Sequence, residues 1–398
     1  MPRLRRVLRL NERTAIEDTG HFDFVDSLRG IAVLGVLLVH TGQRVEGLPG
    51  PVDAATNFGA YGVHLFFVAS AFTLFASLSR RSSSESRPTL NYFLRRFFRI
   101  APLFWLAIVF YLRWNGTGPQ YWAPHGIGWA DVLATACFAH GWRPTMINSV
   151  VPGGWSIAVE MNFYLLVPWL FRRLTSARRA VWFFIACLTF QAVVNAAMRP
   201  VFLRQLSADE QYLGALMEIM WLPAQLPVFA AGFVLYRWIV PDRARHSSGA
   251  RLTPAARWLS WPAFVMLVTV LGFSLSGLAP TSTFWGTVFA ILAAGLALHP
   301  SSVFVNGFTR YLGDISYSGY LVHFAVLDVA ERVLRHFTPL ARYPLPHLAV
   351  LYAAVVCGTA LVATATTRLL EQPARGAGRA LIAALERRHR PPLLELSA

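Results

Sequence analysis

The chain has 398 residues, of which 55% are hydrophobic and only 14% are charged, and its formal net charge is +16. Soluble domains carry about 25% charged residues, so this composition excludes an ordinary soluble protein and indicates an integral membrane protein. The positive charge does not indicate nucleic-acid binding, because the arginines cluster at the ends of apolar segments. The cysteines (Cys137, Cys187 and Cys357) lie far apart without metal-ligand spacing, so the sequence predicts neither disulfides nor a metal site.

Apolar segments long enough to cross a bilayer follow one another along most of the chain. The sequence therefore predicts an all-α integral membrane protein with about ten transmembrane helices, near residues 27–45, 58–78, 99–114, 155–171, 180–198, 213–236, 258–277, 284–299, 312–331 and 347–369. The shorter apolar segment 129–141 is expected to lie at the membrane surface or to enter the membrane without crossing it.

The distribution of arginine predicts the orientation of these helices. When the N-terminus is placed in the cytoplasm and the chain crosses ten times, most of the arginines fall on the cytoplasmic side, as the positive-inside rule requires. We therefore predict cytoplasmic termini and a multi-pass membrane protein, and its expected location is a bacterial inner membrane. Its expected parts are a basic N-terminal tail (1–25), a transmembrane domain (26–371) and a basic C-terminal tail (372–398). Glu371, beside Pro373, is expected only to end the tenth helix.

A cation and an imidazole bound a ten-residue, almost wholly apolar run in the first predicted span. Arg29 and His40 are eleven residues apart, which is three helical turns, so they share one face about 16 Å apart along the axis. A charged or titratable side chain inside the membrane costs about 2.5 to 3.5 kcal/mol, and such a residue therefore indicates a function. In the alternative interpretation, Arg29 extends to the lipid headgroups and His40 only ends the helix.

A basic motif precedes the third predicted span, where Arg95, Arg96 and Arg99 follow one another closely. Arginine binds phosphate groups with paired hydrogen bonds, so the motif is a candidate phosphate site. Arginines at the cytoplasmic end of a membrane helix also serve simply as anchors, and the spacing alone favours that simpler interpretation.

The fourth predicted span carries Ser156, Glu160 and Tyr164 at intervals of four residues, so they share one helix face. A carboxylate inside the membrane needs a partner. Glu160 is expected at a depth similar to that of His40, and we predict that it pairs with this histidine and raises its basicity. The alternative is a purely structural ion pair.

The ninth predicted span carries Ser316, Tyr320 and His323 on one face. A single histidine near the middle of the membrane more often forms hydrogen bonds between helices than catalyses a reaction, and this is the favoured interpretation of His323.

Five blocks of sequence, in order, resemble the integral-membrane acyltransferase 3 family. They are Asp26–Gly30 continuing to His40, Tyr61–Phe72, Arg95–Arg99, Trp155–Tyr164 and Leu312–His323. The chain departs from the family pattern at His64, Ala71, Met161 and Asn162, positions that bear on the acceptor pocket more than on the reaction type.

The resemblance implies transfer of an acyl group, often acetyl, from cytoplasmic acyl-CoA to a hydroxyl of a sugar, a polysaccharide precursor or a lipid, without a metal. His40 would be the general base, Glu160 would orient it, and Tyr164 would stabilise the oxyanion. The donor would bind to Arg29, Arg95, Arg96 and Arg99, and the remaining substrate contacts would come from Ser156, Tyr164, Tyr320 and His323. Expected partners are membrane lipids, acyl-CoA and a carbohydrate or lipid acceptor, and no feature indicates an oligomeric state.

A transporter or flippase is the alternative function, since intramembrane charges can also form a substrate path. The sequence shows neither an inverted repeat nor a pair of broken helices, which argues against it. A different class of membrane acyltransferase is disfavoured by the ordered blocks.

Overall fold

The chain is described here from a computed structural model covering residues 22–246, 281–298, 300–337 and 342–389, and every regular element in these ranges is a helix. This confirms the predicted all-α fold. The predicted span 258–277 and most of the predicted N-terminal tail lie outside the described residues.

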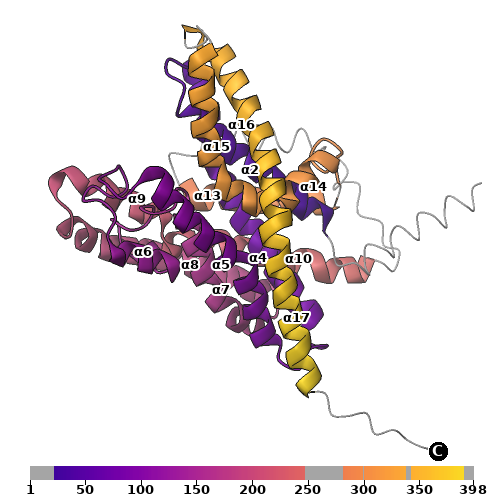
Figure 1. Cartoon of the computed structure of the whole chain (residues 1–398). Coiled ribbons are helices and arrows are strands. Elements are labelled where there is room, and N and C mark those ends of the chain that lie inside the picture. The colour runs from indigo at the N-terminus through magenta and orange to yellow at the C-terminus, as the bar shows by residue number, and fades with distance from the viewer. Residues whose placement is uncertain (1–21, 247–280, 299, 338–341, 390–398) are drawn as a thin grey trace, which may run out of the picture.

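Long helices cover the remaining predicted spans (Figure 1). They are α2 (Asp23–Gly42), α4 (Gly62–Arg81), α5 (Pro88–Asn115), α7 (Gly154–Arg173), α8 (Ala177–Arg204), α10 (Leu222–His246), α13 (Thr281–Leu298), α15 (Ser316–Phe337) and α16 (Pro344–Thr366). Shorter helices are α3 (Gly50–Phe58), α6 (Trp129–Ala136), α9 (Gln211–Met220) and α14 (Gly307–Asp314), and α17 (Gln372–His389) follows α16.

Five helical stretches in the described part of the chain are long and apolar enough to cross a membrane. They are Asp23–Gly42, Gly50–Arg81, Ala177–Arg204, Ala208–Val240 and Pro344–Arg388. The chain thus has the composition and helices of a membrane protein, while the count of ten spans and the cytoplasmic termini stay predictions.

Two predicted spans are broken in the structure, so the prediction that the chain has no such pair is wrong. The span 213–236 consists of α9 and α10, which are separated at Trp221, where the backbone is extended with ψ 165°. The span 312–331 consists of the end of α14 and the start of α15, separated at Ile315. Pro223, which follows the first break, cannot continue the hydrogen bonding of α9. Hydropathy averaged over a window does not detect such short interruptions.

The segment 129–141 forms only the eight-residue helix α6 and a short 3₁₀ turn at His140–Trp142. A helix of this length cannot cross a bilayer, which agrees with the prediction that the segment does not cross. Asp131 caps α6 by accepting a hydrogen bond from the Gly128 backbone N–H at 2.8 Å.

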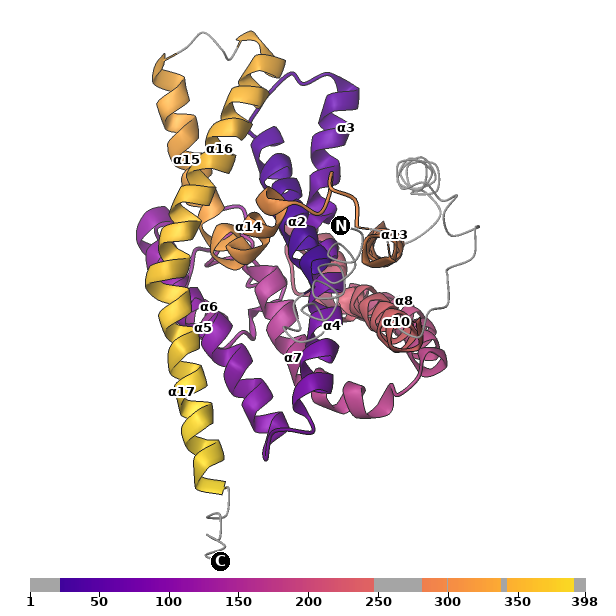
Figure 2. The same cartoon turned by 90° about the vertical axis from the view of Figure 1, so that its right-hand side faces the viewer.

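Helix α2 is the central element of the molecule and is surrounded by α4, α13, α14, α15 and α16 (Figure 2). Glycines permit this close packing. A Cβ atom on Gly30 would lie 2.0 Å from the carbonyl oxygen of Thr309 in α14, and one on Gly59 would lie 2.2 Å from that of Gly35. Small residues allow helix backbones to approach in this way in membrane proteins. This packing fixes the positions of Arg29 and His40 on α2.

Substitution of Gly30 tests this close contact. Alanine normally stabilises a helix interior by about 1 kcal/mol relative to glycine. At Gly30 the new methyl group would meet backbone rather than a movable side chain, so we expect Gly30→Ala to lower the free energy of unfolding by about 1–3 kcal/mol. Thermal unfolding in detergent measures the effect. Gly307→Ala is the matched control, because nothing lies within 4 Å of a Cβ there, and equal stability of the two variants would contradict the assignment.

The prediction that Glu371 and Pro373 end the tenth helix is wrong, because the chain stays helical beyond both residues. A π-helical turn, Thr367–Glu371, follows α16 and leads directly into α17. A π-turn shifts the hydrogen-bond register, and such turns often accompany functional sites. Residues 372–389 of the predicted tail therefore form a helix, which lies beside α5 (Figures 1 and 2).

Candidate active site

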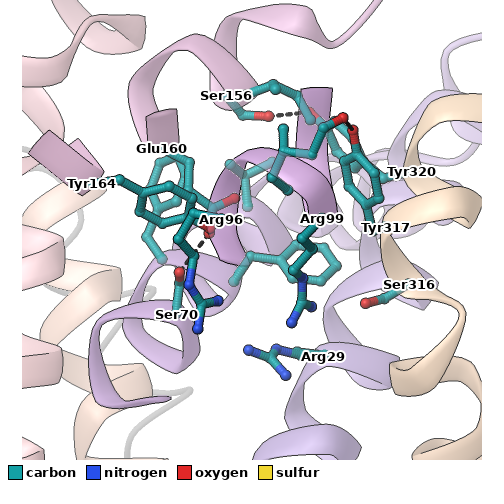
Figure 3. Close-up of a pocket in the computed structure, with 15 residues that line it drawn as sticks. Arg29, Ser70, Arg96, Arg99, Ser156, Glu160, Tyr164, Ser316, Tyr317 and Tyr320 are labelled. Atoms are coloured by element: carbon teal, nitrogen blue, oxygen red, sulfur yellow. Dashed lines mark hydrogen bonds between the residues drawn. The ribbon is translucent and has the colours of Figure 1, made fainter. Parts of the chain in front are cut away.

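A cavity lies among α2, α4, α5, α7 and α15 and encloses about 610 Å³ of empty space, part of it open to solvent. Its polar lining consists of Arg29, Ser70, Arg96, Arg99, Ser156, Glu160, Tyr164, Ser316, Tyr317 and Tyr320 (Figure 3), and its apolar lining of Val63, Phe66, Phe67, Ile100 and Ile157.

Three of the predicted donor-binding arginines meet in this cavity (Figure 3). Arg29 donates hydrogen bonds to Thr73 Oγ1 at 3.0 Å and to Asp26 Oδ1 at 3.2 Å. Arg96 lies over the ring of Tyr164, 5.8 Å from its centroid. Neither Arg96 nor Arg99 forms an ion pair with any residue that the structure describes. The site therefore holds positive charge that is available to a ligand.

The fourth predicted arginine, Arg95, does not line the cavity with the other three. Its guanidinium forms two hydrogen bonds with the carboxylate of Glu85, at 2.7 and 3.1 Å. Consecutive residues point about 100° apart around a helix, and Arg95 therefore faces away from the direction of Arg96. Glu85, which pairs with Arg95, lies in the turn between α4 and α5. The arginine motif within α5 therefore does not show that Arg95 has this partner.

Glu160 lies on the cavity wall, but the predicted Glu160–His40 pair does not form. Its Oε1 accepts hydrogen bonds from Ser70 Oγ at 2.5 Å and from Tyr164 OH at 2.6 Å. The depth of Glu160 was predicted on the assumption that α7 begins at the membrane surface. In the structure α7 follows a loop whose Val150 and Val151 are buried, so the helix begins inside the protein.

The Tyr164 hydroxyl donates its proton to Glu160. It is therefore committed to that carboxylate, and the predicted use of Tyr164 as an oxyanion donor is not supported by this geometry.

His40 does not line the cavity, and its imidazole contacts Gln43, His323 and Phe324 instead. Its Nδ1 lies 2.9 Å from Oε1 of Gln43. Because an amide oxygen only accepts, Nδ1 carries the proton and Nε2 has a free lone pair. The imidazole stacks on that of His323 with centroids 5.3 Å apart and lies 4.5 Å from the Phe324 ring. Gln43 thus has the orienting role that was predicted for Glu160.

His323 lies between His40 and Tyr320, which is a residue of the cavity lining. It is 1% exposed, and its Nδ1 donates to the Tyr320 carbonyl of its own helix at 2.7 Å. The predicted hydrogen bond from His323 to another helix is therefore wrong, and Nε2 has no partner among the described residues. Tyr320 lines the cavity, where its hydroxyl accepts from Ser156 Oγ at 2.8 Å and donates to the Gly153 carbonyl at 3.0 Å. The order from the cavity outward is Tyr320, His323, His40.

Several site residues were not predicted from the sequence. Ser70 and Tyr317 line the cavity, and Thr73 holds Arg29. Glu371, which was expected only to end a helix, is 2% exposed and accepts a hydrogen bond from Ser318 Oγ at 3.1 Å. These residues could have been found from the sequence as hydroxyl or carboxyl groups in otherwise apolar helices, because a buried polar group needs a hydrogen-bond partner.

Comparison with known proteins identifies the type of chain that carries this cavity. The family described as acyltransferase domain matches residues 22–368. The chain belongs to the acyltransferase 3 family. It is therefore an acyltransferase.

Two relatives of this acyltransferase are similar over most of its length. One is the exopolysaccharide production protein ExoZ of Rhizobium meliloti (strain 1021), which is 29% identical over 81% of this chain and 92% of the relative. Another is the acyltransferase MdmB of Streptomyces mycarofaciens, 25% identical over 77% of this chain and 79% of the relative. No solved structure gives a significant match.

Proposed function

We propose that this acyltransferase is a membrane O-acyltransferase that takes an acyl group, acetyl in the simplest case, from cytoplasmic acyl-CoA. The acceptor is the hydroxyl of a carbohydrate, such as a polysaccharide precursor, in a bacterial inner membrane. The name of the exopolysaccharide relative supports a carbohydrate acceptor, and a lipid hydroxyl is the alternative acceptor.

The observation that carries this proposal is the presence in the cavity of two arginines, Arg96 and Arg99, that have no ion-pair partner among the described residues. Arg96 and Arg99 lie with Arg29 at the end of α5 that is predicted to be cytoplasmic. Ser316, the first residue of α15, also lines the cavity. The positive end of that helix dipole therefore adds to the charge of the arginines. A ligand with several phosphate groups, such as the nucleotide end of coenzyme A, matches this charge.

The donor then extends along α2 from Arg29 toward His40, a distance of about 16 Å for eleven helical residues. Tyr320 lines the cavity and contacts His323, which stacks on His40, so the tyrosine side chain is expected to move when the thioester reaches the histidine. His40 Nε2 takes the proton of the acceptor hydroxyl while the oxygen attacks the thioester carbonyl. The carbon–sulfur bond breaks, and the leaving thiolate takes the proton from the imidazolium.

The test is consumption of labelled acetyl-CoA by the purified full-length protein. We expect release of free CoA that increases when carbohydrate acceptors are added, together with a labelled ester that mild base removes. Since α9–α10 and α14–α15 are broken helices, which also occur in transporters, the competing outcome is specific. Transport of a glycan precursor into vesicles without acetyl-CoA, and without CoA release, would contradict the proposal.

A further inference from the structure

The C-terminal helix α17 is fixed to α5 along one face (Figures 1 and 2). Residues spaced three or four apart share a helix face, and here they are Glu371, Arg375, Gly378, Ile382 and Glu386. Gly378 permits the contact, because a Cβ atom there would lie 2.8 Å from the Cβ of Phe98 in α5. The two helices therefore touch at the residue directly before Arg99.

Glu386 fixes the other end of this contact. Its carboxylate accepts hydrogen bonds from the backbone N–H groups of Ser86 at 3.0 Å and Arg87 at 3.4 Å, and from Asn91 Nδ2 at 2.7 Å. These groups surround the start of α5, where a helix leaves N–H groups without intrahelical partners. Glu386 thus caps α5 from a position about 300 residues away in the sequence. The segment predicted as a tail is an integral part of the structure around the donor arginines.

This attachment places Arg375 one helical turn before Gly378, on the part of α17 that lies beside the Arg96–Arg99 segment of α5. Arg375 is half-buried and lies 3.4 Å from the carboxylate of Glu371. It is also close enough to Arg99 and Arg96 for their positive charges to repel it. Arg379 lies one turn further along α17, exposed, with no ion pair in the described part of the chain. The Glu371 carboxylate offsets only part of this positive charge, and like charges gathered in one place favour a further anion between them.

We propose that Arg375 and Arg379 of α17 bind a phosphate group of the donor's nucleotide end, so that the C-terminal helix forms one wall of the donor site. This inference rests on the proposed function and extends it to residues outside the matched family region, 22–368. The arginines of α5 and α17 would grip the nucleotide from two sides, while the acyl-bearing arm enters the cavity past Arg29.

A comparison of two donors tests the inference in the full-length enzyme. Arg375→Gln removes one charged contact, so we expect the KM for acetyl-CoA to rise about tenfold with kcat nearly unchanged. Acetyl-pantetheine lacks the nucleotide, and its KM is expected to equal that of the wild type. Arg379→Gln should also raise the KM for acetyl-CoA, and it leaves the Arg375–Glu371 ion pair in place. Arg375→Lys, which keeps the charge, should recover part of the lost affinity.

Arg387→Gln is the matched control, because Arg387 is an exposed arginine of α17 outside the face that contacts α5. Its KM for both donors should stay at the wild-type value. An unchanged KM for acetyl-CoA in both the Arg375 and Arg379 variants would overturn the inference, as would an equal rise for the two donors. If the wild-type protein itself consumes no acetyl-CoA, the proposed function fails and not merely the role of α17.

Discussion

Replacing His40 with alanine is expected to reduce acyl transfer by at least about 100-fold, because a positioned general base contributes about 10²–10⁴ to the rate. The fold should survive, since the imidazole is only partly buried and its one hydrogen bond among the described residues goes to Gln43, directly after the end of α2. The rate of CoA release at saturating acetyl-CoA and acceptor measures the effect. Because His40 lies beyond the cavity wall, the KM for acetyl-CoA should change little.

Two further variants make this prediction specific. His125→Ala removes an exposed histidine (83% of its side chain is accessible) that pairs with Glu210, and it should leave the rate unchanged. Glu160→Gln changes the one carboxylate on the cavity wall, which binds Ser70 and Tyr164 rather than His40. If Glu160→Gln abolished acyl transfer while His40→Ala retained it, the base would be Glu160 and the proposed role of His40 would be wrong.

Simultaneous substitution of Arg96 and Arg99 by glutamine is expected to raise the KM for acetyl-CoA by about 100-fold or more. Each charged hydrogen bond contributes about 1.5–3 kcal/mol, and each 1.4 kcal/mol corresponds to a factor of ten in affinity. Neither guanidinium has an ion-pair partner within the described ranges, so no carboxylate is left without a partner by the change. Initial rates over a range of acetyl-CoA concentrations give the two kinetic constants separately.

Arg95→Gln is the control from the same motif. Arg95 is engaged with Glu85 and lies outside the cavity, so this variant should keep the wild-type KM. An anchoring role at the membrane surface would instead affect the three arginines alike and would alter the amount of folded protein more than the KM. A similar rise in KM for the Arg95 variant and the double variant would contradict the assignment of donor binding to Arg96 and Arg99 but not to Arg95.

The family comparison and the all-α fold agree with what residues 22–368 indicated through their ordered blocks and apolar segments. Hydropathy and helical periodicity are local properties, and a sequence displays local properties directly. Arg29, Arg96 and Arg99 could be selected for the same reason, because a charge at the end of an apolar helix is visible without knowing its neighbours. Their meeting in one cavity agrees with that selection.

The partners of these side chains depended on the tertiary structure. Arg95 and Arg96 are adjacent in sequence, yet one binds Glu85 and the other lines the cavity. Glu160 binds Ser70 from α4, and His40 is oriented by Gln43 and stacked on His323 from α15. Helix α17, expected as a tail, caps α5 through Glu386. By itself, the sequence determined which segments become helices and which charged residues lie in apolar helices, because both follow from neighbouring residues. Only the packing of distant helices decided which charges are already neutralised and which stay available to a ligand.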